Sequence, residues 1–251
     1  MQTNPRDIAT TLLKGIDVLR AFEDSQCLTT NEIAERTGQS RATARRLCLT
    51  LVQAGLLNHK DYCFYLTART LPLAGSFLRA NGFGLKVSPI MAKCADSLTH
   101  GINLAMNDGT HALIVAREIT HGSRTTKGLT IGARLPLHAT ALGMALLSQG
   151  PDGLLERLHL RRFTEKTVTN PTALRGVIAE VRRSSVSVEI GGWEEDVVGI
   201  AVPVGESASI GTSYPSDFPD LDAVLKSAEH HLKIAAEALR PLPAMAALKI
   251  I

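Results

Sequence analysis

The sequence predicts an α+β protein of two domains, an N-terminal winged helix-turn-helix and a C-terminal domain with a mainly antiparallel sheet. Two short helical segments with end-capping residues lie between residues 28 and 57, and two strand-like segments follow directly. Beyond residue 85, helical and strand-like segments alternate around an Asn-Asp-Gly turn at 107–109. A length of 251 residues suits two cores. We expect a DNA-binding domain at 1–70, a linking helix at 71–84 and a second domain at 85–251.

Local signals place the helix ends of the N-terminal motif. Thr29 and Glu32 have the spacing of a capping box, in which each side chain satisfies a free amide at the helix start. Gly38 falls where the chain must turn sharply, and we expect a positive φ there. Ser40 is a suitable N-cap for the second helix, and Gly55 follows its end.

Apolar spacing predicts how these helices pack. The second helix carries one stripe with steps of three and four residues, namely Ala44, Leu47, Leu51 and Ala54. In the preceding helix, 11–22, a similar stripe is predicted to face the core and consists of Leu12, Ile16, Leu19 and Phe22. The segment after Gly55 is predicted to form a hairpin with its turn at 58–62, which would be the wing.

The exposed start of the second helix points to DNA. A recognition helix places its first turn deepest in the major groove, where arginine can bond guanine and a threonine methyl can contact thymine. Arg45 and Arg46, one turn later, are expected to meet phosphates. The predicted DNA-binding residues are Ser40, Arg41, Ala42, Thr43, Arg45, Arg46 and Lys60. The alternative interpretations are an ordinary solvated basic surface and, for Lys60, a solvated loop lysine.

Charge is local rather than global. The net charge is only +3, but residues 36–60 contain five basic residues and no acidic one. The four cysteines Cys27, Cys48, Cys63 and Cys94 show no metal-ligand spacing, so we expect buried, reduced thiols. Residues 1–10 do not resemble a signal peptide and no apolar run is long enough to span a membrane, which favours a cytoplasmic protein.

A second candidate site lies at 132–143. Here a loop meets a helix whose first turn consists of small residues, and such a start exposes backbone amides that suit an anion. Arg134 could pair with a carboxylate. The alternative is a helix start packed tightly for steric reasons, with Arg134 merely at the surface. His138 is interpreted as a structural histidine bonded to backbone, and the acidic run after Trp193 as a solvated loop.

No enzyme, metal or cofactor motif competes with these interpretations. The chain contains no GxxxxGK[ST], HExxH, GxGxxG or GxSxG pattern. We therefore expect no cofactor, no metal and no catalytic residue. Two alternatives remain, an enzyme with an accessory winged helix and a winged-helix interaction module that does not read DNA sequence.

Taken together, the motifs resemble those of the IclR family of bacterial transcriptional regulators. The resemblance is carried by KGIDVL at 14–19, the helix-turn-helix at 28–57, YLT at 65–67, LPLHATALGMALL at 135–147 and GIAVPV at 199–204. The segment GARLPLHATALG is most similar to the branch that responds to aromatic acids such as protocatechuate or 4-hydroxybenzoate.

The resemblance implies a GAF-like effector domain, a homodimer or tetramer, a palindromic operator on double-stranded DNA and a small carboxylate effector. It also implies that the effector contacts the small-residue helix start, an acidic residue in a following strand, the position before AVP and a hydroxylated position near Thr212 or Ser213. With the loop residues, the predicted effector-binding set is Arg134, His138, Ala139, Thr140, Ala141, Gly143, Glu189, Gly199 and Ser213.

The chain departs from the family pattern at the predicted pocket floor. The segment after AVPV, 205–211, is short. Gly199 has no side chain where relatives often carry a polar or thiol group, and Glu189 is larger than the usual aspartate. The DNA-binding half shows no comparable departure.

Overall fold

The computed structural model describes residues 4, 7–120 and 129–249. The chain divides into two compact units, Met1–Phe77 and Leu78–Ile251. The division falls within helix α4 (Leu71–Ala80), in the segment where the sequence predicts a linking helix. Of residues 1–10, on which the signal-peptide argument rests, 1–3 and 5–6 lie outside the described part.

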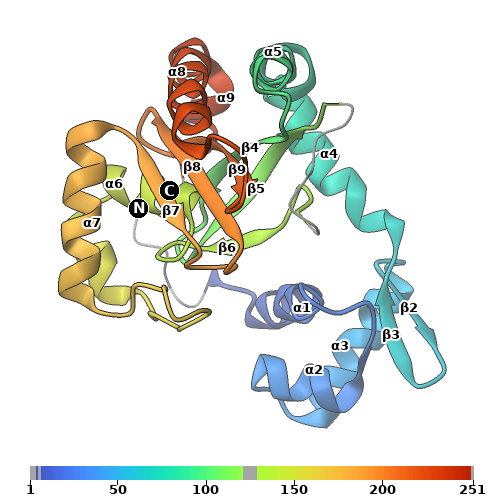
Figure 1. Ribbon diagram of the computed structural model, residues 1–251. Coiled ribbons are helices and arrows are strands. Elements are labelled where there is room, and N and C mark those ends of the chain that lie inside the picture. The colour runs from blue at the N-terminus through green and yellow to red at the C-terminus, as the bar shows by residue number, and fades with distance from the viewer. Residues whose placement is uncertain (1–3, 5–6, 121–128, 250–251) are drawn as a thin grey trace. The chain divides into compact units, whose positions relative to one another are not determined.

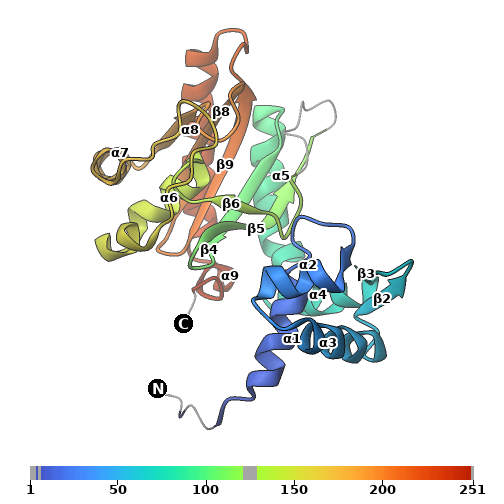
Figure 2. The ribbon, with the colours of Figure 1, turned by 90° about the horizontal axis from the view of Figure 1, so that it is seen from below.

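The described part of the first unit contains three helices and a small antiparallel sheet with the strand order β1-β3-β2 (Figure 2). Its elements are α1 (Thr10–Arg20), β1 (Leu28–Thr29), α2 (Thr30–Thr37), α3 (Arg41–Gln53), β2 (Leu57–Lys60) and β3 (Cys63–Leu66). A short 3-10 helix, Ala68–Thr70, leads into α4. This is a winged helix-turn-helix, as the sequence predicts.

The predicted capping interactions are confirmed. The Glu32 amide donates to the Thr29 hydroxyl at 3.4 Å, and the Thr29 amide donates to the Glu32 carboxylate at 2.7 Å. Gly38 ends α2 with a φ of 63°, and the Ser40 hydroxyl accepts from the Thr43 amide at the start of α3. These local bonds fix the end of α2 and the start of α3, and so the turn between the two helices.

The predicted stripe on α1 is half right. Phe22 is buried and Leu19 packs against the core, but Leu12 is 64% exposed and Ile16 is 37% exposed, and Val18 is buried instead. The core side of α1 thus includes Val18, Leu19 and Phe22, and the larger apolar residues of its first half face outward.

The stripe on α3 is correct in its first half only. Ala44 and Leu47 are buried, but Leu51 is half-buried and Ala54 is exposed. Cys48 is fully buried and occupies the core instead.

The second unit is a six-stranded, fully antiparallel sheet with the order β6-β5-β4-β9-β8-β7 (Figure 1). Its strands are β4 (Ile102–Asn107), β5 (His111–Glu118), β6 (Arg134–Pro136), β7 (Ser187–Ile190), β8 (Val197–Val204) and β9 (Ala208–Pro215). Its helices are α5 (Ser88–Leu98), α6 (Ala141–Gln149), α7 (Pro171–Ser184), α8 (Leu221–Leu239) and α9 (Pro243–Ala246). A π-helical turn, Phe83–Val87, precedes α5, and a 3-10 helix, Asp152–Arg157, follows α6.

Helices cover both faces of this sheet, as Figures 1 and 2 show. On one face α5, α8 and α9 contribute to a core that includes Met91, Leu104 and Leu232. On the other face α6 packs on the sheet and α7 packs on α6, with Leu147 and Ile178 fully buried. The predicted α+β class and the antiparallel sheet are confirmed.

Helix α6 is the most enclosed helix element of the second unit's described part, since residues 141–148 are all buried. A helix that is apolar around its whole circumference must be covered on every side. Gly143 makes this possible, because an added Cβ would lie 2.4 Å from the Leu137 carbonyl oxygen. The Ser209 hydroxyl on β9 donates to the Leu142 carbonyl at 3.0 Å and ties the helix to the sheet.

The thiol prediction is half wrong. Cys48 and Cys94 are buried, and burial raises the pKa of each thiol to about 11. Cys27 is exposed and Cys63 is half-buried. All four are free cysteines.

The contact of Gly143 with Leu137 yields a stability prediction. Gly143→Ala should lower the free energy of unfolding by about 1–3 kcal/mol, since backbone rather than a flexible side chain blocks the added methyl group. Gly176→Ala in α7 is the matched control, because nothing lies within 4 Å of its added Cβ, and a gain of up to about 1 kcal/mol is expected. Urea denaturation of both variants measures the difference; equal stabilities would contradict the packing argument.

Candidate nucleic-acid interface and ligand pocket

The start of α3 forms an exposed basic surface. Arg41 and Ala42 are exposed in the first turn, and Thr43 is half-buried behind them. The Ser40 hydroxyl donates to the Thr43 hydroxyl at 2.9 Å, so this threonine is oriented by the cap. Arg45 and Arg46 are exposed one turn later. The structure thus brings together all of the predicted DNA-binding residues of α3 on its solvent side.

A fourth arginine of this segment has a different role. Arg36 donates to the Ala21 carbonyl at 2.8 Å and to the Ser25 hydroxyl at 3.0 Å, and so holds α2 to the end of α1. Gln39 similarly donates to the Lys14 carbonyl in α1. The positive residues of 36–60 therefore divide into one structural arginine and a remainder that faces solvent.

The wing is tighter than the sequence predicts. β2 continues through Lys60, which pairs with Cys63, and only Asp61 and Tyr62 form the turn. Both have positive φ, 50° and 65°, as a two-residue type I′ hairpin requires. Lys60 is exposed at the end of β2, while the tip itself presents Tyr62, which is 89% exposed. Sequence reasoning missed Tyr62, because a bulky residue is unfavourable in the left-handed region.

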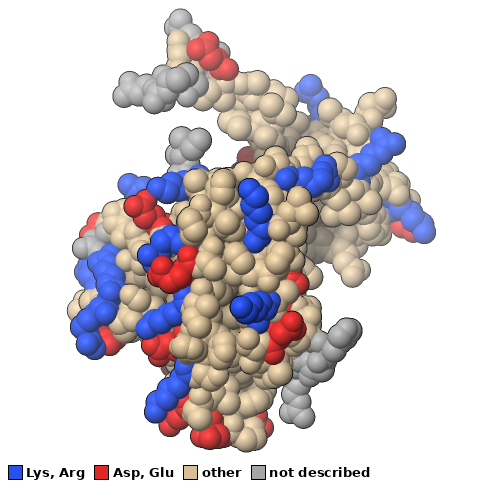
Figure 3. All heavy atoms as spheres, turned by 90° about the horizontal axis from the view of Figure 1, so that it is seen from above, with Lys and Arg blue, Asp and Glu red and all other residues tan. Residues whose placement is uncertain are grey.

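The face shown in Figure 3 is mixed in charge. Basic and acidic side chains are interspersed over it. The basic side chains on that face therefore do not form one extended area.

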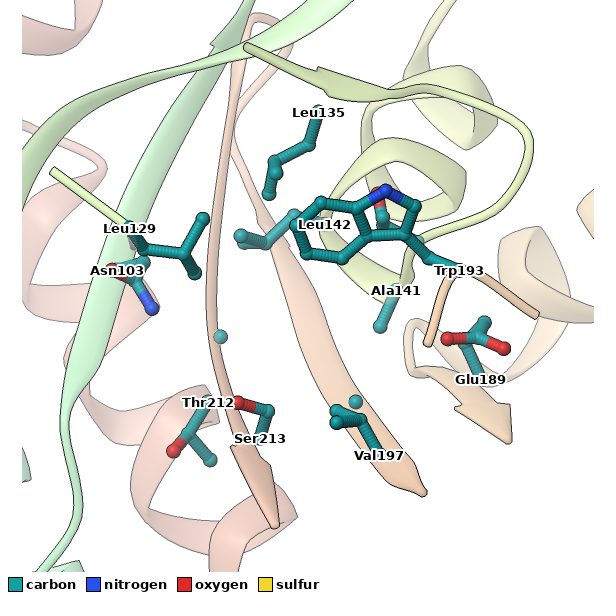
Figure 4. Close-up of a pocket in the computed structure, with 13 residues that line it drawn as sticks. Asn103, Leu129, Leu135, Ala141, Leu142, Glu189, Trp193, Val197, Thr212 and Ser213 are labelled. Carbon is teal, nitrogen blue, oxygen red and sulfur yellow. The ribbon is translucent and has the colours of Figure 1, made fainter. Parts of the chain in front are cut away.

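The second unit contains a pocket between the sheet and the start of α6 (Figure 4). Its cavity volume is about 50 Å³, so it is a narrow site. The residues lining it are Asn103, Leu129, Leu135, Thr140, Ala141, Leu142, Glu189, Trp193, Val197, Gly199, Gly211, Thr212 and Ser213.

The sheet register explains the shape of the pocket floor. Glu189 on β7 pairs with Gly199 on β8, which pairs with Ser213 on β9, so the three positions form one row across the sheet. In the neighbouring row Gly211 on β9 pairs with Asn103 on β4. Gly199 and Gly211 thus lie between Glu189 at one end of the floor and Asn103 at the other. Because these glycines have no side chains, the space above them is open.

The start of α6 borders this space. Thr140 caps the helix, since its hydroxyl accepts from the Gly143 amide at 3.1 Å and donates to the Pro136 carbonyl at 2.9 Å. An added Cβ at Gly199 would lie 3.2 Å from the Ala141 Cβ and 3.8 Å from the Ala141 amide nitrogen. The glycine therefore leaves room beside the Ala141 amide at the start of α6.

Glu189 is the one ionisable side chain among the described residues that line the pocket. Burial raises the pKa of Glu189 to about 7, against the opposing effects of a bond from the Gly192 amide and the charge of Lys166. The loop beyond it is held by Thr164 and Thr167, whose hydroxyls each donate to a carbonyl of the Gly-Gly pair 191–192 at 2.6 Å. A group with such a pKa is both proton donor and acceptor near neutral pH.

Four of the predicted effector residues lie outside the lining of this pocket. Arg134 is engaged elsewhere, by Asp108 at 2.6 Å and the Thr110 hydroxyl at 2.7 Å. His138 bonds the Arg161 carbonyl through Nε2 at 2.9 Å, and burial lowers the pKa of its imidazole, which confirms a structural histidine. Ala139 is buried, and Gly143 serves the contact with Leu137. The other five, Thr140, Ala141, Glu189, Gly199 and Ser213, line the pocket together.

Sequence reasoning missed much of the remaining lining. Leu135 and Leu142 belong to the motif that was singled out, but their apolar character gave no chemical signal. Trp193, interpreted as part of a solvated loop, instead forms one wall (Figure 4). Asn103 could have been found as a polar residue inside the otherwise apolar strand 102–106.

Within residues 4, 7–120 and 129–249, no group of three or more potential ligands is placed to hold a metal ion. No helix in this part of the chain has the length and apolar character needed to cross a bilayer.

The fold and these two sites define a winged helix-turn-helix protein with a separate ligand-binding domain. Two family models match the chain, the IclR helix-turn-helix domain at residues 11–61 and the bacterial transcriptional regulator IclR C-terminal domain at residues 83–210. The chain belongs to the IclR family of bacterial transcriptional regulators.

Individual relatives agree with this assignment. The chain is 28% identical to the Pca regulon regulatory protein of Pseudomonas putida over 82% of this chain and 72% of that protein. It is 30% identical to the Pca operon regulatory protein of Acinetobacter baylyi over 79% and 74% of the two chains. A solved IclR homologue of Microbacterium hydrocarbonoxydans, complexed with 4-hydroxybenzoate, has the same fold with a TM-score of 0.70, 24% identity and coverage of 95% and 98%.

The buried carboxyl group predicts a pH dependence of stability. Because the pKa of Glu189 is raised from its unfolded value to about 7, the folded state binds more protons than the unfolded state between these two pKa values. Its contribution to stability is complete below the unfolded pKa and is lost as the pH rises to about 7. The free energy of unfolding of the native protein relative to Glu189→Gln should therefore fall between about pH 5 and pH 7.5 and level off above.

Urea denaturation at a series of pH values tests this. Glu165→Gln is the matched control, because Glu165 is an exposed carboxylate. A difference between the native protein and Glu189→Gln that stays constant from pH 5 to pH 8 would contradict the effect of burial.

Proposed function

We propose that this protein binds a specific operator through α3 and the wing, and that it acts in the cytoplasm on double-stranded DNA. The observation that carries the proposal is the capped start of α3, which exposes its arginines and Ala42 without an acidic neighbour in the helix. Arg41, Ala42 and Thr43 contact base edges, whereas Ser40, Arg45, Arg46 and Lys60 contact the DNA backbone.

The effector is a small carboxylate that binds in the pocket of the second unit. The amides at the start of α6 carry the partial positive charge of a helix N-terminus, and the apolar walls suit a compact carbon skeleton. Glu189, when protonated, can donate a hydrogen bond to the carboxylate, so one charge rather than two is buried. The pocket residues of this proposal are Thr140, Ala141, Glu189, Gly199 and Ser213. The 4-hydroxybenzoate bound to the solved Microbacterium homologue favours an aromatic acid as the effector and a catabolic operon as the target.

The active form is a homodimer, or a tetramer that consists of two such dimers. Leu12, Leu13 and Ile16 on α1 are exposed, and apolar residues gathered on one helix commonly mark an interface. Two copies related by a two-fold axis would present two recognition helices to a palindromic operator. Effector binding then changes the affinity for DNA, and DNA changes the affinity for effector by the same factor, commonly worth about 1–3 kcal/mol.

We also propose that the protein is not an enzyme. The described lining of the pocket offers one ionisable group, Glu189, and no nucleophile paired with a base. Regulation by binding requires only that the ligand be recognised and released.

Arg41→Ala provides the first test of DNA recognition. The operator is first obtained by selecting duplexes from a random pool with the native protein. Arg41→Ala should weaken binding to that duplex about 5- to 150-fold and relax the preference at one base pair, because a bidentate base contact is lost. Arg162→Ala, an exposed arginine of the second unit, is the matched control. Fluorescence anisotropy at fixed salt gives the affinities. Unchanged affinity and unchanged sequence preference would contradict a contact of Arg41 with a base in the major groove.

A second variant separates phosphate from base contacts. Arg46→Ala should weaken binding to all duplexes by a similar factor and reduce the salt slope of log K by about one. A duplex of scrambled sequence should bind roughly a thousandfold more weakly than the selected one. Equal affinity for the two duplexes would favour the interaction module over the regulator.

A further inference from the structure

One polar atom of the pocket has no partner. Asn103 is only 6% exposed, and its Oδ1 accepts no hydrogen bond within the described part of the structure. Buried amide oxygens are nearly always paired, so an orphan at the wall of a pocket calls for a partner that comes from outside the chain. The neighbouring Thr212 cannot supply it, because its hydroxyl donates to the Gly101 carbonyl at 2.8 Å.

Asn103 lies far from the proposed carboxylate position. It stands on β4, three strands away from Glu189 on β7, which at about 4.8 Å per strand separates their backbones by about 14 Å. Figure 4 shows the two residues on opposite sides of the pocket, with Leu142 and Trp193 between and above them. Gly211, the partner of Asn103 in the sheet, leaves the floor beside it open.

Gly211 cannot readily become a larger residue. An added Cβ would lie 2.6 Å from the Ile200 carbonyl oxygen and 2.8 Å from the Ala201 Cβ. The opening in front of Asn103 is therefore fixed by the backbone of the sheet, not by a side chain that could move to cover the amide.

The amide defines the chemistry of its partner. Oδ1 needs a donor, and the same amide would need an acceptor if it were turned by 180°. A hydroxyl group donates and accepts and so satisfies both orientations, whereas an apolar group satisfies neither. A carboxylate cannot donate to Oδ1.

We infer that Asn103 recognises a hydroxyl group of the effector, at the end of the ligand opposite to its carboxylate. The inference rests on the proposed function and narrows it. The effector is a hydroxy acid whose apolar body lies between Leu142 and Trp193, and Asn103 determines the preference for the hydroxylated form over the deoxy form.

Matched pairs of acids test this with the full-length protein. Isothermal titration calorimetry compares benzoate with 3- and 4-hydroxybenzoate, and phenylacetate with 4-hydroxyphenylacetate. The native protein should bind the hydroxylated member of at least one pair about tenfold or more tightly, since the deoxy acid leaves the Asn103 amide unpaired.

Asn103→Leu should abolish this preference while it leaves binding of the deoxy acid unchanged or tighter. The ratio of the two dissociation constants is the decisive measurement, because a merely structural role would change both constants together. Asn103→Ala is the second variant in case the leucine impairs folding. Met106→Leu, on the same strand but outside the pocket lining, is the matched control and should keep the native ratio.

The outcomes separate the inference from the proposed function. If acids bind but the hydroxylated and deoxy members bind equally, the inference is overturned and the carboxylate effector stands. If the preference exists and survives in Asn103→Leu and Asn103→Ala, another residue reads the hydroxyl and the inference is also overturned. If no acid of any pair binds, both the effector class and the inference fall.

Discussion

The structure of the second unit depends on the close approach of Gly143 to the backbone of Leu137. That approach lets α6 pack against the loop before it and bury its whole circumference between the sheet and α7. The helix start is then fixed over the sheet, where its first amides border the pocket. A looser helix would leave these amides to water, and a helix with a polar side could not be enclosed at all.

Burial of α6 also determines what the pocket can contain. The floor carries no side chain at Gly199 and Gly211, so it is open at these two positions. Glu189 and Asn103 lie at opposite ends of the floor, and Thr140, Thr212 and Ser213 add hydroxyl groups to the lining. The result is an apolar slot with a polar group at each end, which favours ligands of matching length and polarity.

Much of this could be predicted from the sequence, for local reasons. The capping box of Thr29 and Glu32, the turn at Gly38 and the cap at Ser40 involve residues within four positions of each other, so their chemistry is visible without the fold. The burial of Val18 in place of Ile16 was not predictable, because it depends on how α1 packs against α3, a helix further along the chain. The placements of Arg134 outside the pocket and of Trp193 in its wall were not predictable for the same reason. Arg134 forms an ion pair with Asp108, which lies 26 positions earlier in the chain. Trp193 lies in the loop between β7 and β8, and the pairing of these two strands places that loop beside the pocket.

Gly199 of the pocket floor has an evolutionary consequence. An added Cβ there would meet only Ala141 within 4 Å, at 3.2 Å from its Cβ, so one nucleotide substitution to an alanine codon would narrow the slot with a shift of a few tenths of an ångström. The recognition helix belongs to the other compact unit and would be untouched. A lineage carrying this fold can therefore exchange the metabolite that it senses, by single steps at one strand position, while it continues to control the same genes.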